Sequence, residues 1–76
     1  MIKLYISETC PFCRKVMDFA YDNRIEYTKK DISNSDNLDE LIKNGGKHQV
    51  PFMVDDKVNM YESDDIIEYL RSKYVL

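Results

Sequence analysis

Cys10-Pro11-Phe12-Cys13 is the stretch that decides the fold, and it holds both cysteines of this 76-residue sequence. An apolar run, Ile2 to Ile6, precedes the stretch, and apolar residues at helical spacing follow it. This order places two sulfur atoms at the start of a helix, where free backbone N–H groups carry partial positive charge. A thiolate is stabilised at such a position, so the motif predicts a cysteine that reacts near neutral pH.

The two cysteines of this motif are expected to differ in role. Pro11 suits the first helical position, where no N–H is needed and its fixed φ matches the helix. Cys10 then lies at the helix cap, half outside the helix, and Cys13 lies slightly deeper on the same helical face. We therefore predict that Cys10 is the attacking thiol and that Cys13 is the resolving thiol.

A metal site is the main alternative use of two cysteines at this spacing. Zinc usually takes four ligands, and the sequence adds only one histidine, His48, to the two cysteines. A closed zinc site would need carboxylates, so no metal ligand is assigned. A metal or iron–sulfur site shared between two chains stays open. A purely structural disulfide is disfavoured, because the loop it would close is too short to remove much chain entropy.

Length and composition predict one small domain over residues 1–76. Hydrophobic residues make up 43% and charged residues 33% of the sequence, which suits a globular fold with a small core. No apolar run has membrane-spanning length, and the first residues lack the features of a signal peptide. We therefore expect a cytoplasmic protein with no membrane partner. The net charge of −3, without a basic run, also predicts no nucleic-acid partner.

The periodicity of the chain predicts strands and helices in the order β-α-β-α-β-β-α. A second strand is expected over 25–32, and a second helix ends at the glycine pair 45–46. An antiparallel hairpin is expected from residue 52 to residue 60, with Asp55-Asp56 as its turn. Ser63 is the expected cap of the last helix, whose buried stripe would include Tyr74. The predicted fold class is α/β, with a four-stranded mixed sheet flanked by three helices.

Three features of the chain resemble the glutaredoxins, small members of the thioredoxin-fold superfamily, and the resemblance covers essentially the whole sequence. They are the Cys-Pro-aromatic-Cys motif at 10–13, Val50-Pro51 before the third strand, and Ser63-Asp64-Asp65 at the start of the last helix. Glu62-Ser63 also resembles the Glu-Ser pair of glutathione S-transferase N-terminal domains. The resemblance implies a thioredoxin-like fold, a cis peptide bond between Val50 and Pro51, and glutathione as co-substrate.

The resemblance also implies where glutathione would lie. The backbone of Val50 would pair with the extended tripeptide as an added strand. Backbone N–H groups of Ser63 and Asp64 would bind the γ-glutamyl carboxylate, and the Asp64 side chain would meet the ammonium. From the residues alone, Ser63-Asp64-Asp65 equally suits plain helix capping. The predicted groove residues are Phe12, Gln49, Val50, Pro51, Ser63 and Asp64.

The predicted function is that of a glutathione-dependent thiol–disulfide oxidoreductase. This enzyme would reduce protein disulfides and glutathione mixed disulfides through Cys10 and Cys13, as a monomer, with disulfide-containing or glutathionylated proteins as partners. One alternative is a redoxin that thioredoxin reductase recharges and that donates electrons to ribonucleotide reductase. Ser7 favours this alternative, because many glutaredoxins carry a lysine there. Another alternative is a dimer that carries an iron–sulfur cluster between two Cys10 thiolates and two glutathiones.

Overall fold

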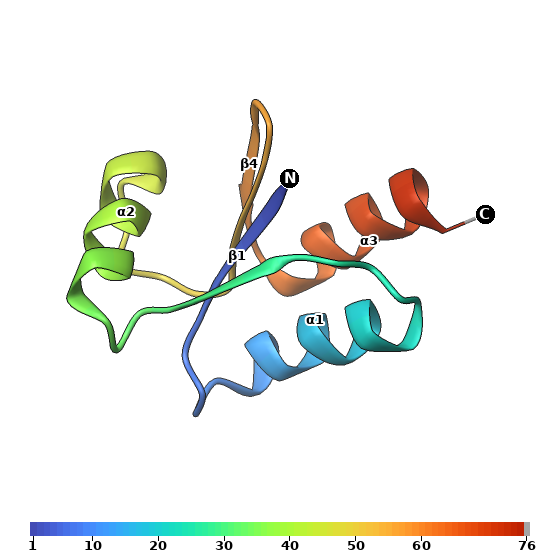
Figure 1. The fold of residues 1–76 in the computed structure, drawn as a ribbon, viewed down its shortest axis with the longest axis horizontal. Coiled ribbons are helices and arrows are strands. Elements are labelled where there is room, and N and C mark those ends of the chain that lie inside the picture. The colour runs from blue at the N-terminus through green and yellow to red at the C-terminus, as the bar shows by residue number, and fades with distance from the viewer. Residues whose placement is uncertain (76) are drawn as a thin grey trace.

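The computed structural model describes residues 1–75 and contains the predicted succession of elements (Figure 1). The strands are β1 (Ile2–Ile6), β2 (Thr28–Asp31), β3 (Phe52–Asp55) and β4 (Val58–Tyr61). The helices are α1 (Pro11–Asp22), α2 (Ser35–Gly45) and α3 (Ser63–Tyr74). Within residues 1–75, no helix has the length and apolar character needed to cross a membrane.

β1 is a central strand of a four-stranded sheet with the order β2-β1-β3-β4. It pairs in parallel with β2, where Lys3 is opposite Thr28, and antiparallel with β3, where Leu4 is opposite Met53. β3 and β4 form the antiparallel hairpin. The predicted mixed sheet is therefore confirmed. β2 and β4 form the two edges of the sheet. Because only a short loop separates the end of β1 from Cys10, a central strand positions the cysteine motif.

The helices cover the two faces of the sheet unequally, with α1 and α3 on one face and α2 on the other (Figure 1). The alternation along β1 explains both layers. Ile2, Leu4 and Ile6 belong to the larger core under α1 and α3, whereas Tyr5 packs with Leu41 in the smaller core under α2. The Tyr5 hydroxyl also donates to Glu40 Oε1 at 2.9 Å, which ties α2 to the centre of the sheet.

Local capping signals set the ends of the first two helices. Asn23 ends α1, and its backbone N–H donates to the Phe19 carbonyl at 3.1 Å. The Asn34 side chain caps the start of α2 by accepting from the Asp36 N–H at 2.9 Å. Gly46 ends α2 with a left-handed φ of 83°, which glycine adopts without a steric penalty. The predicted end of the second helix at the glycine pair is confirmed.

Three details of the strands and of the buried stripe of α3 differ from the predictions. The second strand begins at Thr28 instead of residue 25, because the register that places Lys3 opposite Thr28 leaves residue 25 beyond the start of β1, and the Ile25 N–H instead donates to a carbonyl of α1 at 2.9 Å. Asp55 belongs to β3, so the hairpin turn consists of Asp56 and Lys57. Tyr74 is 41% exposed and is not part of the buried stripe; only its hydroxyl reaches inward.

Asp55 explains why the last two of these predictions were wrong. Its side chain is only 1% exposed, and it accepts hydrogen bonds from Tyr69 Oη at 2.8 Å, Lys73 Nζ at 3.1 Å and Tyr74 Oη at 2.6 Å. Burial opposes the charge, but the hydrogen bonds from Tyr74, Tyr69 and Lys73 outweigh it and lower the pKa of Asp55 to about 2. The ionised carboxylate therefore holds the later turns of α3 against β3.

We predict that Asp55→Asn lowers the free energy of unfolding at pH 7 by roughly 2–4 kcal/mol, because a buried charge is removed from three donors. The folded-state pKa of about 2 lies below the unfolded value. The stabilisation is therefore fully present above about pH 5 and is lost as the pH falls towards 2. Urea denaturation of both proteins at several pH values measures this difference. A difference that stayed constant on acidification would contradict the role of the charge.

Candidate active site

Cys10 caps the N-terminus of α1 with its own sulfur. Its backbone is extended, with φ −92° and ψ 113°, and its Sγ accepts a hydrogen bond from the Cys13 N–H at 3.2 Å. The Cys10 N–H donates to the Ser7 carbonyl at 3.1 Å, and the Cys10 carbonyl accepts from the Arg14 N–H at 3.1 Å. The predicted cap position is confirmed. The sulfur thus lies at the N-terminus of α1, beside the backbone N–H groups of its first turn.

Cys13 has a different environment. Its side chain is fully buried in the larger core, whereas Cys10 is partly exposed. Burial raises the pKa of the Cys13 thiol to about 12, and the hydrogen bond with Cys10 acts in the same direction. Cys13 is therefore protonated at neutral pH, and Cys10 is the more accessible of the two sulfurs. The attacking role of Cys10 and the resolving role of Cys13 stay predictions.

A groove of about 320 Å³ opens beside the start of α1. It is formed by three segments that are distant in sequence: the first turn of α1, the loop before β3, and the start of α3. All the groove residues predicted from the sequence line it, and Glu62 is an additional lining residue. The complete lining is Phe12, Gln49, Val50, Pro51, Glu62, Ser63 and Asp64.

The loop wall of the groove has the predicted backbone. The peptide bond between Val50 and Pro51 is cis, as the resemblance to glutaredoxins implied. Val50 is partly buried and packs against both hydrophobic cores, and Pro51 is buried. The loop therefore presents a fixed backbone to the groove immediately before β3 begins.

The start of α3 forms the other wall of the groove, which we call the helix wall. Its N-cap residue differs from the predicted one. Glu62 is the N-cap residue, with a φ of 70°, and Ser63 is the first residue of α3, with its side chain buried. Within residues 1–75, no side chain makes a capping hydrogen bond at this helix start. The first-turn N–H groups of α3 thus retain their capacity to bind an anion.

An ion pair between Lys15 and Asp64 connects α1 and α3 at this end of the molecule. Both side chains are exposed, so the pair contributes at most about 1 kcal/mol to stability. Its position matters more than its energy, because the ammonium of Lys15 neutralises a carboxylate that lines the groove. Sequence reasoning missed this pair, since its members lie 49 residues apart and no local pattern links them.

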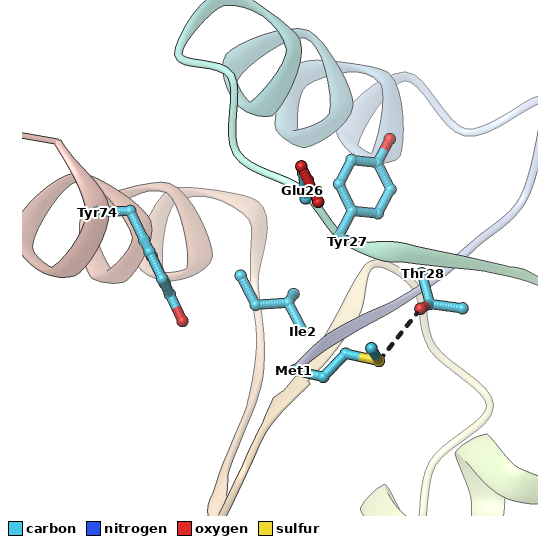
Figure 2. A pocket seen from close by; sticks show the side chains of 6 residues that line it. All are labelled: Met1, Ile2, Glu26, Tyr27, Thr28 and Tyr74. Atoms are coloured by element: carbon cyan, nitrogen blue, oxygen red, sulfur yellow. Dashed lines mark hydrogen bonds between the residues drawn. The ribbon is translucent and has the colours of Figure 1, made fainter.

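A second pocket, of about 350 Å³, lies near the start of β1, at the opposite end of that strand from the cysteines (Figure 2). Its lining residues are Met1, Ile2, Glu26, Tyr27, Thr28 and Tyr74. Neither this lining nor that of the groove contains a cysteine or a histidine. The groove is the candidate active site because its lining residue Phe12 lies between Cys10 and Cys13 in the first turn of α1, whereas the second pocket lies at the far end of β1.

Residues 4–76 match the family described as the glutathione S-transferase N-terminal domain. The chain belongs to this family. The match includes the cysteine motif, the segment with the cis-proline and the whole of α3. The Glu-Ser pair at 62–63, which resembled this family in the sequence, lies in the groove.

Solved glutathione transferases have the same fold. A glutathione S-transferase from the Antarctic clam Laternula elliptica superposes with a TM-score of 0.83 at 32% identity, over 96% of this chain and 35% of the clam chain. A glutathione transferase homologue from Drosophila mojavensis, solved with bound glutathione, gives a TM-score of 0.77 at 27% identity, over 97% of this chain and 35% of that chain. This chain thus spans about a third of the length of these structures.

A curated relative belongs to a different functional class. The protein named Global transcriptional regulator Spx 2, from Bacillus anthracis, is 45% identical over 42 residues, which are 54% of this chain and 32% of the regulator. The predicted thioredoxin-fold superfamily is confirmed by these comparisons. The family that matches within it is the glutathione S-transferase N-terminal domain.

We predict that iodoacetamide at pH 7 alkylates Cys10 at least roughly tenfold faster than Cys13. The Cys10 sulfur is partly exposed and accepts an N–H bond, whereas the Cys13 thiol is buried and has a pKa of about 12. Timed quenching followed by peptide mass spectrometry measures both rates, and the Cys10→Ser and Cys13→Ser proteins give each rate separately. The two rates should converge in urea. Equal rates in the native protein would refute the assignment of Cys10 as nucleophile.

Proposed function

We propose that this chain is a glutathione-dependent thiol–disulfide oxidoreductase domain with Cys10 as its nucleophile. The observation that carries the proposal is the position of the Cys10 sulfur, which caps α1 at 3.2 Å from the Cys13 nitrogen. The groove beside it presents a fixed peptide backbone on one wall and a helix N-terminus on the other. A thiolate at such a place is suited to sulfur exchange.

Glutathione fits the chemistry of the groove. It is an extended tripeptide with an ammonium and a carboxylate at its γ-glutamyl end. The backbone of Val50 offers an N–H and a carbonyl for strand-like pairing with the middle of the tripeptide. The first turn of α3 offers N–H groups to the γ-glutamyl carboxylate, and Asp64 offers a carboxylate to the ammonium.

The proposed reaction begins when the Cys10 thiolate attacks one sulfur of a substrate disulfide. A mixed disulfide forms at Cys10, and the second substrate sulfur leaves as a thiolate and takes up a proton. With a glutathionylated protein, the groove holds the glutathionyl half, so the reduced protein leaves. A second glutathione thiolate then attacks the mixed disulfide, which releases oxidised glutathione and restores the Cys10 thiolate.

A protein disulfide requires the second cysteine. Cys13 attacks the Cys10 sulfur of the mixed disulfide and releases the reduced protein, and two glutathione molecules then reduce the Cys10–Cys13 disulfide. Because burial raises the pKa of Cys13 to about 12, its proton must leave during the attack, and the departing protein thiolate can accept it. Phe12, which is 62% exposed, provides an apolar surface on which the protein substrate docks beside Cys10.

We predict that Cys10→Ser reduces turnover of both substrate classes to the uncatalysed background. Cys13→Ser should retain removal of glutathione from a glutathionylated peptide and lose reduction of a protein disulfide. Coupled assays with glutathione, glutathione reductase and NADPH measure both activities. Full turnover by the Cys10→Ser protein would overturn the proposal. A parallel assay with thioredoxin reductase and NADPH, without glutathione, identifies the electron donor, because the redoxin alternative requires turnover in that assay only.

A second candidate function is suggested by the relative that is named a transcriptional regulator. In this case the Cys10–Cys13 pair would act as a redox switch: a partner protein would bind its dithiol and disulfide forms with different affinity. The pair would not turn over with glutathione. Oxidation of the purified protein would then form a disulfide that persists in the presence of glutathione. Multiple turnovers in the coupled assay would exclude the switch as the sole function.

A further inference from the structure

Tyr61 joins the two walls of the groove without lining it. It is the last residue of β4, and Glu62 follows it directly in the helix wall. Its hydroxyl accepts a hydrogen bond from the Lys47 N–H at 3.1 Å and donates one to the Lys47 carbonyl at 3.1 Å. The phenol therefore satisfies both backbone groups of one residue in the segment that leads to Gln49 and the loop wall.

Neighbouring contacts hold Tyr61 in this position. Its ring packs against Phe52 with 4.6 Å between centroids, and the Lys47 ammonium lies 5.5 Å from the ring centroid. Gly45 leaves room for the hydroxyl, because a Cβ there would overlap Tyr61 Oη and lie 2.8 Å from Cζ. Asn59, also on β4, donates to a carbonyl near the end of α2 at 3.2 Å.

We propose that Tyr61 is a positioning residue that sets the spacing between the loop wall, 49–51, and the start of α3. The inference rests on the proposed use of the groove for glutathione. An extended tripeptide must bond to Val50 on one wall and to the N–H groups of α3 on the other, so its affinity depends on this spacing. The reaction at Cys10 does not depend on this spacing, because the Cys10 sulfur is positioned by β1 and α1.

Tyr61→Phe is the test, because it keeps the ring against Phe52 and removes only the hydroxyl. We expect the KM for glutathione, and the Kd for glutathione in the Cys10→Ser background, to rise roughly five-fold. The kcat at saturating glutathione and the alkylation rate of Cys10 should stay within about two-fold of the parent values. Hydrogen exchange at amides 47–50 should become faster, because the segment has lost both side-chain bonds.

Tyr69→Phe is the matched control. It also removes one phenol hydroxyl, which donates to Asp55 at 2.8 Å at the end of β3 remote from the groove. This variant should lose stability and keep the parent KM. Gly45→Ala provides an independent variant, because its methyl group displaces the Tyr61 hydroxyl. It should raise the KM on its own, and its effect should be smaller when it is added to Tyr61→Phe.

The outcomes separate this inference from the proposed function. If the parent protein binds glutathione and Tyr61→Phe binds it equally well, the positioning role is overturned. The same conclusion follows if Tyr61→Phe and Tyr69→Phe raise the KM by the same factor, since loss of stability then explains both. If the parent protein does not bind glutathione, the proposed function itself is overturned.

Discussion

The hydrogen bond from the Cys13 N–H to the Cys10 sulfur is the interaction on which the proposed chemistry depends. It forms because β1, whose side chains are buried apart from Lys3, ends at Ile6 and is followed by a short loop that leads to the start of α1. The Ser7 carbonyl holds the Cys10 N–H at the end of that loop. The sulfur thus satisfies a free N–H of the helix, as a cap does, and it is the same atom that we propose as the nucleophile.

The groove beside this sulfur is assembled from parts that the fold brings together at one end of the sheet. β1 contributes the approach to Cys10, the antiparallel pairing of β3 with β1 places the loop of Val50 nearby, and β4 leads through Tyr61 into the start of α3. The pairing of the three strands therefore brings the groove-lining segments to the same end of the sheet. Glutathione S-transferase N-terminal domains share this fold.

The sequence was sufficient where the signal is local. The cap position of Cys10 followed from Pro11 and the periodicity after it, and the end of α2 followed from Gly46. The cis bond before Pro51 followed from a family resemblance, because the residues alone suit either isomer. These predictions were confirmed because each depends on a few adjacent residues or on a motif with a known setting.

The sequence was insufficient where two distant segments decide the outcome. Nothing near Asp55 indicates that three donors from α3 converge on it, so the residue resembled part of a turn. Ser63 resembled a cap because its residue type favours that position, yet the backbone places Glu62 there. The pairing of Tyr61 with Lys47 has no local signature either, since a tyrosine at the end of a strand is common.

β2 is an edge strand whose charged side chains oppose pairing with other copies of the chain. An open sheet edge carries free N–H and carbonyl groups that can template strands from other molecules. β2 is such an edge, and it carries Lys29 and Lys30, each paired with a carboxylate of the same chain, Glu8 and Glu40 respectively. An identical strand approaching this edge would bring its own lysines alongside them. The approaching strand would have to break these ion pairs or place its lysines beside them, and either event opposes pairing at this edge.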